Sequence, residues 1–237
     1  MMEMVGNREF SDYRDLSDDE CHALIKSAKA SLGDDLVILG HHYQRADVYQ
    51  HADLKGDSLK LSRLASQADS EHIIFCGVHF MAEVADIMSK SSQKALLPDL
   101  AAGCSMADMA NLSKVSRAWN ELKSVLGSEM SVTPITYINS AADLKAFCGE
   151  HGGIVCTSSN ASQIVSWGLT QQDKILFFPD QHLGRWSGHQ LGLMNDSDMK
   201  VWDPDLWMGG LSEEEIKSAK ILPVSYTHLT LPTKRIV

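Results

Sequence analysis

Short apolar runs alternate along the chain with stretches in which apolar residues recur every three or four positions. Unbroken apolar runs of this length are typical of parallel strands covered on both faces, and the longer spacing predicts helices. The predicted strands are 36–39, 73–76, 95–97, 132–138, 153–156 and 175–178, with a weaker one beginning at Val201. The predicted helices are 58–65, 82–88, 106–126, 140–148, 160–167 and 212–220, preceded by one that starts at Ser17 and that Gly33 ends.

This alternation predicts an α/β fold made of α/β/α sandwiches with short parallel sheets. Two helix starts are explicit, because Ser17 and Ser212 are each followed three residues later by glutamate, which is the capping-box pattern. Pro134 interrupts the strand 132–138. Because proline cannot donate to a ladder, Pro134 favours an edge strand or the start of a strand.

The polar residues that follow the predicted strands occur in two similar series. In the first, Gly40-His41-His42-Tyr43 ends a strand and Asp57-Ser58 follows. About a hundred residues later, Tyr137-Ile138-Asn139 ends a strand and Thr157-Ser158-Ser159-Asn160 follows. Because ligands of parallel sheets bind at the carboxyl ends of the strands, the repeat predicts a site built between similar units.

Each of these residues also has a purely structural interpretation. His41 either takes part in proton transfer or metal binding, or is a core histidine whose ring is satisfied by a backbone carbonyl. Asp57-Ser58 and Thr157–Asn160 either cap helices or bind an anion at a helix N-terminus, and their recurrence favours the anion site. The polar run from Asp180 to Arg185 is either functional or a structural network.

The five cysteines form an odd, scattered set, which indicates reduced thiols rather than a disulfide framework. Cys76 and Cys156 lie in or beside apolar strands and fit buried positions. Cys104 is different, because it stands between Gly103 and Ser105 in a turn-like stretch that can present a thiolate to a cavity.

Composition narrows the function classes. The 237 residues suffice for one large domain or two small ones, and the net charge of −10 argues against non-specific nucleic-acid binding. No apolar stretch approaches the roughly 20 residues that span a bilayer. The N-terminus lacks the apolar segment of a signal peptide, so a cytoplasmic location is expected.

Several motifs, in order from about residue 35 to 222, resemble the quinolinate synthase family. They are Gly40-His41-His42-Tyr43-Gln44, Gly56-Asp57-Ser58-Leu59, Pro98-Asp99, Gly103-Cys104-Ser105-Met106-Ala107-Asp108, Tyr137-Ile138-Asn139, Cys156-Thr157-Ser158-Ser159-Asn160-Ala161 and Pro179-Asp180-Gln181-His182-Leu183-Gly184-Arg185. The resemblance implies three α/β/α domains around a pseudo-threefold axis, each giving one cysteine to a [4Fe–4S] cluster. It also implies condensation of iminoaspartate, made by L-aspartate oxidase, with dihydroxyacetone phosphate to give quinolinate, phosphate and water in NAD biosynthesis.

The resemblance also implies residue roles. Cys104 matches a cluster ligand, whereas Cys156 matches a position that does not bind the cluster. The iminoaspartate site is implied at His41, Ser58, Tyr137, Ile138, Asn139 and Ser158. His41, Tyr43 and Tyr137 are the implied catalytic residues, with His41 and Tyr43 as candidates for proton transfer.

The family pattern stops at Pro223, just before the motif that carries the second cluster cysteine. We therefore expect an N-terminal helical segment (1–33), a first domain (34–115) that has Cys104 near its end, an incomplete second domain (116–222) and a non-family tail (223–237) of artefactual origin. On this interpretation the third domain is missing and the chain as written is inactive and cluster-free.

Two interpretations from other classes remain open. One is a non-enzymatic α/β module that binds a small dicarboxylate or phosphorylated ligand. The other is a zinc hydrolase that uses His41, His42 and Cys104, which needs a further ligand at suitable geometry.

Overall fold

The computed structural model describes residues 11–128, 130–193 and 195–226. By its internal contacts the chain divides into two compact units, residues 1–100 and 101–237. The division lies between Leu100 and Ala101, whereas the sequence suggested a boundary between residues 115 and 116. Cys104 therefore belongs to the second unit, and each unit is described separately below.

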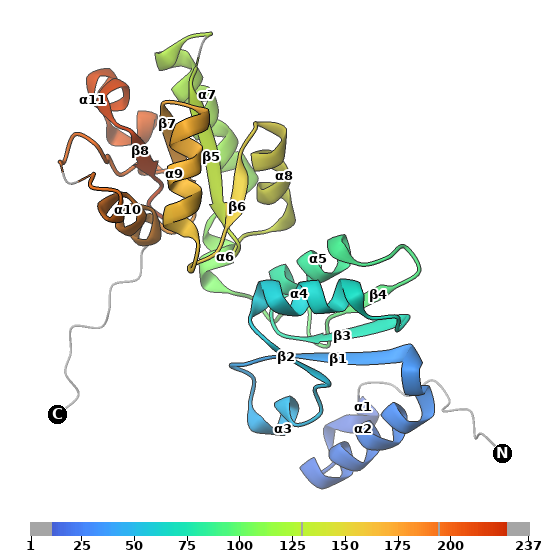
Figure 1. Ribbon diagram of the computed structural model, residues 1–237. Helices are drawn as coiled ribbons and strands as arrows, with labels where there is room; N and C mark the ends of the chain where they lie inside the picture. The colour runs from blue at the N-terminus through green and yellow to red at the C-terminus, as the bar shows by residue number, and fades with distance from the viewer. Residues whose placement is uncertain (1–10, 129, 194, 227–237) are drawn as a thin grey trace. The chain divides into compact units, whose positions relative to one another are not determined.

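The first unit contains a four-stranded parallel sheet with the strand order β2-β1-β3-β4. Its strands are β1 (Leu36–His41), β2 (Leu54–Gly56), β3 (His72–Cys76) and β4 (Lys94–Leu96). Its helices are α1 (Ser11–Arg14), α2 (Asp18–Leu32), α3 (Ala46–Tyr49), α4 (Ser58–Gln67) and α5 (His79–Met88), with a 3-10 turn, η1 (Gly33–Asp35), before β1. In Figure 1, α4 and α5 lie on one side of the sheet and α2 lies on the other.

The second unit repeats this architecture with the strand order β6-β5-β7-β8, again entirely parallel. Its strands are β5 (Val132–Tyr137), β6 (Ile154–Cys156), β7 (Lys174–Phe178) and β8 (Ile221–Pro223). Its helices are α6 (Ser105–Met109), α7 (Leu112–Leu126), α8 (Ala142–Glu150), α9 (Ala161–Gln171), α10 (Gln181–Gln190) and α11 (Glu213–Ser218), with a 3-10 turn, η2 (Trp207–Gly210), before α11.

Alternate residues of β7 face the two separate cores of this unit. Leu176 and Phe178 pack in one core with residues of α7, α8 and α11. Ile175 and Phe177 pack in the other core with residues of α9. Because successive strand side chains point to opposite faces, a continuously apolar strand such as β7 requires helices on both sides. The predicted α/β/α sandwich is therefore confirmed.

The two predicted capping boxes are also confirmed. The Ser17 hydroxyl accepts from the Glu20 backbone N–H and the Glu20 carboxylate accepts from Ser17, and Ser212 and Glu215 make the same reciprocal pair. Each box satisfies N–H groups that a helix start otherwise leaves unpaired.

The single helix predicted over 106–126 is wrong, because two helices, α6 and α7, occupy this range. Ala110 is extended, and the side chain of Asn111 accepts a hydrogen bond from the Lys114 backbone N–H at 3.0 Å. The apolar spacing continues across the break, so periodicity alone did not reveal it. The asparagine cap was the available signal.

The edge position suggested for Pro134 is also wrong, because β5 lies between β6 and β7. The Ile138 backbone N–H donates to the Cys156 carbonyl at 2.8 Å, so the even-numbered residues of this strand direct their N–H groups toward β6. The first residue of β6 is Ile154, which pairs with Ile135. A backbone N–H at position 134 would point past the first residue of β6, where no strand residue could accept it. Proline therefore costs no ladder bond at this position.

Several elements were not predicted. They are the short elements α1, η1, α3, β2 and η2 and the longer helix α10. The weak strand expected from Val201 is reduced to isolated bridges, among them Trp202 to Val224. Pro223 ends β8, and Val224 and Tyr226 are buried in the core of the second unit. The rest of the predicted tail, 227–237, lies outside the described residues. Within the part of the chain that is described, no helix has both the length and the apolar character needed to cross a membrane.

Candidate functional site

Tyr137 is the centre of the polar group at the carboxyl end of the second sheet. It is the last residue of β5, and its side chain forms a hydrogen bond with Ser158, which follows β6. Burial is the main cause of a raised Tyr137 pKa, and the hydrogen bond with Ser158 acts in the opposite direction by lowering it. Tyr137 therefore stays protonated at neutral pH and can donate a hydrogen bond to an anion.

Cys104 and Asp180 act electrostatically on Tyr137. Asp180, then Cys156 and then Cys104 raise its pKa further, because a negative charge on a carboxylate or thiolate disfavours ionisation of the phenol. Cys104 is a half-buried N-cap residue of α6, and Asp180 is the N-cap of α10. Tyr137 thus interacts with Ser158 and, through charge, with Asp180, Cys156 and Cys104.

Asp180 also caps the N-terminus of α10. Its carboxylate accepts hydrogen bonds from the backbone N–H groups of His182 at 2.8 Å and Leu183 at 3.2 Å. The polar run that begins with Asp180 therefore opens α10. Its effect on Tyr137 was missed from sequence, although its position directly after a buried strand was a signal.

The loop that carries Ser158 is held by hydrogen bonds between its own polar residues. The Asn160 amide oxygen accepts from the Thr157 backbone N–H at 2.7 Å and from the Thr157 hydroxyl at 3.0 Å. Thr157 and Ser159 hydroxyls are also 3.0 Å apart. Ser158 is exposed at this turn, immediately before α9, where helix N–H groups favour an anion.

The predicted residues Ile138 and Asn139 are placed differently from each other. Ile138 is only 6% exposed, and its backbone N–H donates to Cys156, so its side chain belongs to the core. Asn139 is half-buried and follows the end of β5. An amide at that point remains close to the carboxyl end of the strand.

The first unit has its own polar group, at the end of β1. His41 is the last residue of this strand and is 4% exposed. Its ring lies 4.0 Å from the Tyr43 ring and 4.2 Å from the His42 ring, measured between centroids. Burial, and then the charge of His42, lower the His41 pKa to about 4, against a smaller opposing effect of Asp57. His41 is therefore neutral at pH 7 and can accept a proton.

Tyr43 and Ser58 complete this group. Tyr43 is 52% exposed, and its hydroxyl lies 3.9 Å from the Met81 sulfur. Ser58 is the first residue of α4, which Asp57 caps by accepting from the Lys60 backbone N–H at 2.9 Å. Because His41 pairs with Gly56 across the sheet, Ser58 is held near the end of β1. The capping interpretation is correct for Asp57, and the neighbouring serine stays available as a predicted ligand.

An iron–sulfur cluster is held by several cysteine thiolates. Among residues 11–128, 130–193 and 195–226, no group of three or more His, Cys, Asp or Glu side chains could hold a metal ion. Cys148 and Cys156 are fully buried thiols, and burial raises the pKa of Cys156 to about 12 and that of Cys148 further. Cys104 is the half-buried cysteine of the second unit, whereas the zinc interpretation combines it with His41 and His42 of the first unit.

Together these features define an α/β/α protein of parallel sheets with polar side chains gathered at the carboxyl ends of the strands. A family profile described as quinolinate synthetase A protein matches residues 23–222. A quinolinate synthase of Herpetosiphon aurantiacus is 53% identical over 220 residues, covering 92% of this chain and 58% of the relative. Another, of Corynebacterium glutamicum, is 51% identical over 212 residues, covering 89% of this chain and 53% of the relative.

A third relative, the quinolinate synthase of a Geobacillus species, is 43% identical over 242 residues, covering 95% of this chain and 65% of the relative. The chain therefore belongs to the quinolinate synthetase A family. It spans between 53% and 65% of the length of these curated relatives.

Proposed function

We propose that this chain carries the iminoaspartate-binding part of a quinolinate synthase. In the parent reaction, iminoaspartate supplied by L-aspartate oxidase condenses with dihydroxyacetone phosphate, and phosphate and water are released as quinolinate forms. The observation that carries the proposal is the hydrogen-bonded pair of Tyr137 and Ser158 at the carboxyl ends of β5 and β6, in a chain that belongs to this family.

The side chains of the second unit suit a dicarboxylate. Tyr137 stays protonated because burial raises its pKa, so it donates to a carboxylate rather than repelling it. The exposed Ser158 hydroxyl stands before α9, whose N-terminus favours negative charge. In the proposal Asn139 adds an amide donor, and Ile138, whose side chain is buried, holds this end of the strand in place.

The side chains of the first unit suit proton transfer and a second anionic contact. With its pKa lowered to about 4, His41 is a neutral base at physiological pH. Tyr43, whose ring contacts that of His41, is the proposed proton donor. Ser58 at the start of α4 is the proposed ligand for an anionic group of the substrate.

The parent enzyme is proposed to use a [4Fe–4S] cluster with Cys104 as one ligand. The remaining cysteines do not complete the ligand set, so a polypeptide of these 237 residues is expected to lack both the cluster and turnover. Anaerobic reconstitution with iron and sulfide, followed by metal analysis and a quinolinate assay, tests this. The Herpetosiphon relative is the positive control, and a stoichiometric cluster with turnover in the short polypeptide would refute the expectation.

Dicarboxylate binding can be tested separately, with L-malate as a stable four-carbon probe in isothermal titration calorimetry. Loss of one hydrogen bond to a charged group weakens binding by about 10-fold or more, which is the result expected for Tyr137→Phe and for Ser158→Ala. Ser166→Ala, an exposed serine of α9, is the matched control and should leave the affinity unchanged. Equal affinities in all four proteins would rule out this binding site.

The second candidate function is a non-enzymatic module that binds a small dicarboxylate or phosphorylated ligand. It is favoured by the same Tyr137–Ser158 pair, since that pair needs no metal to form. Malate binding that Cys104→Ala leaves intact is expected of such a module, and a stoichiometric cluster with turnover after reconstitution would exclude it.

A further inference from the structure

The two faces of the sheet of the first unit are covered differently, although β1 is buried from Val37 to His41. Val37, Leu39, Ile73 and Phe75 are between 0% and 7% exposed, and α4 and α5 cover one side of this sheet. Their neighbours along the same two strands point to the opposite face, where they line a cavity of about 490 Å³. Four of these neighbours are Leu36, Ile38, Ile74 and Cys76.

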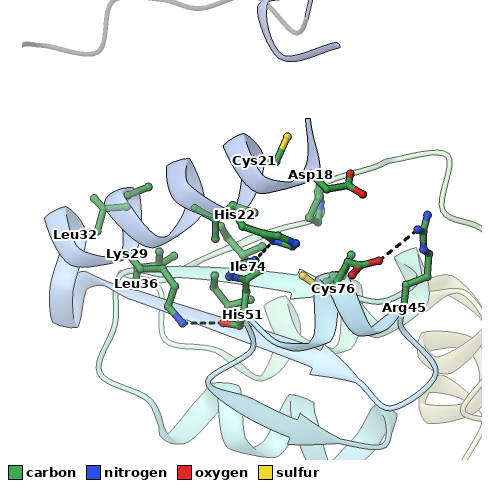
Figure 2. Close-up of a pocket in the computed structure, with 16 residues that line it drawn as sticks. Asp18, Cys21, His22, Lys29, Leu32, Leu36, Arg45, His51, Ile74 and Cys76 are labelled. Atoms are coloured by element: carbon green, nitrogen blue, oxygen red, sulfur yellow. Dashed lines mark hydrogen bonds and ion pairs between the residues drawn. The ribbon is translucent and has the colours of Figure 1, made fainter. Parts of the chain in front are cut away.

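Helix α2 forms the outer wall of this cavity. Figure 2 shows α2 above the sheet, with His22, Lys29 and Leu32 among the labelled side chains that line the space. None of the residues of α2 is buried. The comparable helix of the second unit, α7, is also 15 residues long and precedes the first strand of its sheet, yet it buries Val115, Ala118 and Leu122. A helix in this position can therefore close the face of a sheet, and α2 leaves a space instead.

Polar contacts at the edge of the cavity hold α2 in place. His22 Nδ1 lies 2.7 Å from His51 Nε2, and Gln50 Nε2 lies 3.2 Å from His22 Nε2. The Lys29 ammonium donates to the His51 carbonyl at 2.7 Å and to Asp53 Oδ1 at 2.6 Å. These contacts hold α2 at a fixed distance from the sheet. The cavity between them is therefore a defined feature of the folded unit.

The charges around the cavity are largely balanced. Lys29 is paired with Asp53, and Arg45 lies 3.4 Å from Asp47. The remaining charged side chain in the lining is the carboxylate of Asp18. Burial and the nearby His22, Lys26 and Lys29 lower the His51 pKa, which disfavours a positive charge on His51. No unpaired cation in the lining is positioned to attract an anion.

We propose that the cavity beneath α2 binds a small, uncharged, mainly apolar molecule. Binding sites for small molecules are commonly clefts of about 300–1,000 Å³ with apolar walls and a few convergent polar groups. Apolar cavities in proteins also take up aromatic molecules, which replace contacts that the walls lack. A compact, uncharged aromatic molecule such as indole fits this description. The inference is independent of the proposed function, because all of its residues lie in the first unit and outside the His41 group.

Indole binding to the full 237-residue chain is the test, followed by NMR of isotope-labelled isoleucine methyl groups. Saturable shifts are expected at Ile25, Ile38 and Ile74, which line the cavity, but not at Ile154 and Ile175 of the second unit. For a ligand of this size we expect a Kd on the order of 1 mM. Absence of saturable shifts at the three cavity residues would overturn the proposal.

Two tryptophan substitutions on α2 give a matched pair. Ala28 lines the cavity and Ala30 does not, and both side chains are exposed. Ala28→Trp should fill the space and weaken indole binding by at least about 10-fold, whereas Ala30→Trp should leave it unchanged. Circular dichroism and thermal unfolding confirm that both variants are folded. Equal indole affinity in the two variants would overturn the assignment to this cavity.

The class of ligand is tested with indole-3-acetate, which adds a carboxylate to the same ring system. Because the lining cations are paired and Asp18 is nearby, indole-3-acetate should bind at least about 5-fold more weakly than indole. Equal or tighter binding of the carboxylate would contradict the proposal of an uncharged ligand.

Discussion

The Tyr137 side chain is hydrogen-bonded to Ser158, although 21 positions separate the two residues in the chain. The parallel pairing of β5 with β6 explains this, since Tyr137 pairs with Cys156 and Ser158 follows two residues later. Because of this hydrogen bond, the pKa of the Tyr137 phenol should change when Ser158 is substituted.

Substitution of Ser158 by alanine is expected to raise the pKa of Tyr137 further. The hydrogen bond with Ser158 lowers this pKa, whereas burial and nearby negative charge raise it, so its loss leaves only the raising effects. NMR titration of isotope-labelled tyrosine measures the change. Ser166→Ala is the control, and a Tyr137 pKa that is the same in Ser158→Ala as in the wild type would show that the hydrogen bond is absent in solution.

Acidification is expected to destabilise the protein through His41. Its folded pKa is lowered to about 4 from an ordinary value of 6.5, so the unfolded chain binds a proton that the folded chain does not. The resulting stability is fully present above pH 6.5 and is lost as the pH falls toward 4. By linkage, the free energy of unfolding should fall by about 2 kcal/mol between pH 7 and pH 5 from this group alone.

Urea unfolding at both pH values measures this loss, and His41→Gln is the informative variant because glutamine does not titrate. The decrease in unfolding free energy between the two pH values should be smaller in His41→Gln by about 2 kcal/mol. An NMR midpoint for His41 near its ordinary value would contradict the explanation directly.

The cysteines should differ strongly in reactivity. Cys148 and Cys156 are 0% exposed, and burial raises the pKa of both thiols, whereas Cys104 and Cys21 are half-buried. Because the thiolate is the reactive form, iodoacetamide should modify Cys148 and Cys156 at least about 100-fold more slowly than Cys104 in the folded protein. Peptide mass spectrometry measures each rate. The difference in rate should disappear in urea. Rapid labelling of Cys148 without denaturant would show that the core around α8 is open to solvent.

Two glycines of the second unit should respond oppositely to alanine. A Cβ on Gly153 would collide with the Pro134 carbonyl oxygen, which is backbone and cannot turn away. Gly149 lies in α8, and a Cβ there meets no atom within 4 Å. Gly153→Ala should therefore destabilise the protein by about 3 kcal/mol, whereas Gly149→Ala should stabilise it by about 0.5 kcal/mol. Thermal unfolding of both variants provides the comparison, and similar melting temperatures would contradict the close approach of β5 and Gly153.

The sequence by itself determined the class of fold and most of the element positions. Continuous apolar runs such as 36–39 and 175–178 can be buried on both faces only in a covered parallel sheet, so they predicted the α/β/α layers. The capping boxes at Ser17 and Ser212 were readable because each depends on residues only three positions apart. The motifs at the strand ends were sufficient to predict the family.

Only the tertiary structure decided which strand was central and which polar residues meet. Pro134 was compatible with an edge by local rules, and it is tolerated in a central strand because the neighbouring strand begins beyond it. The proximity of Asp180 and Cys104 to Tyr137, like the space beneath α2, depends on strand order and helix height. Strand order and helix height arise from packing between distant segments, which the local patterns of the sequence do not encode.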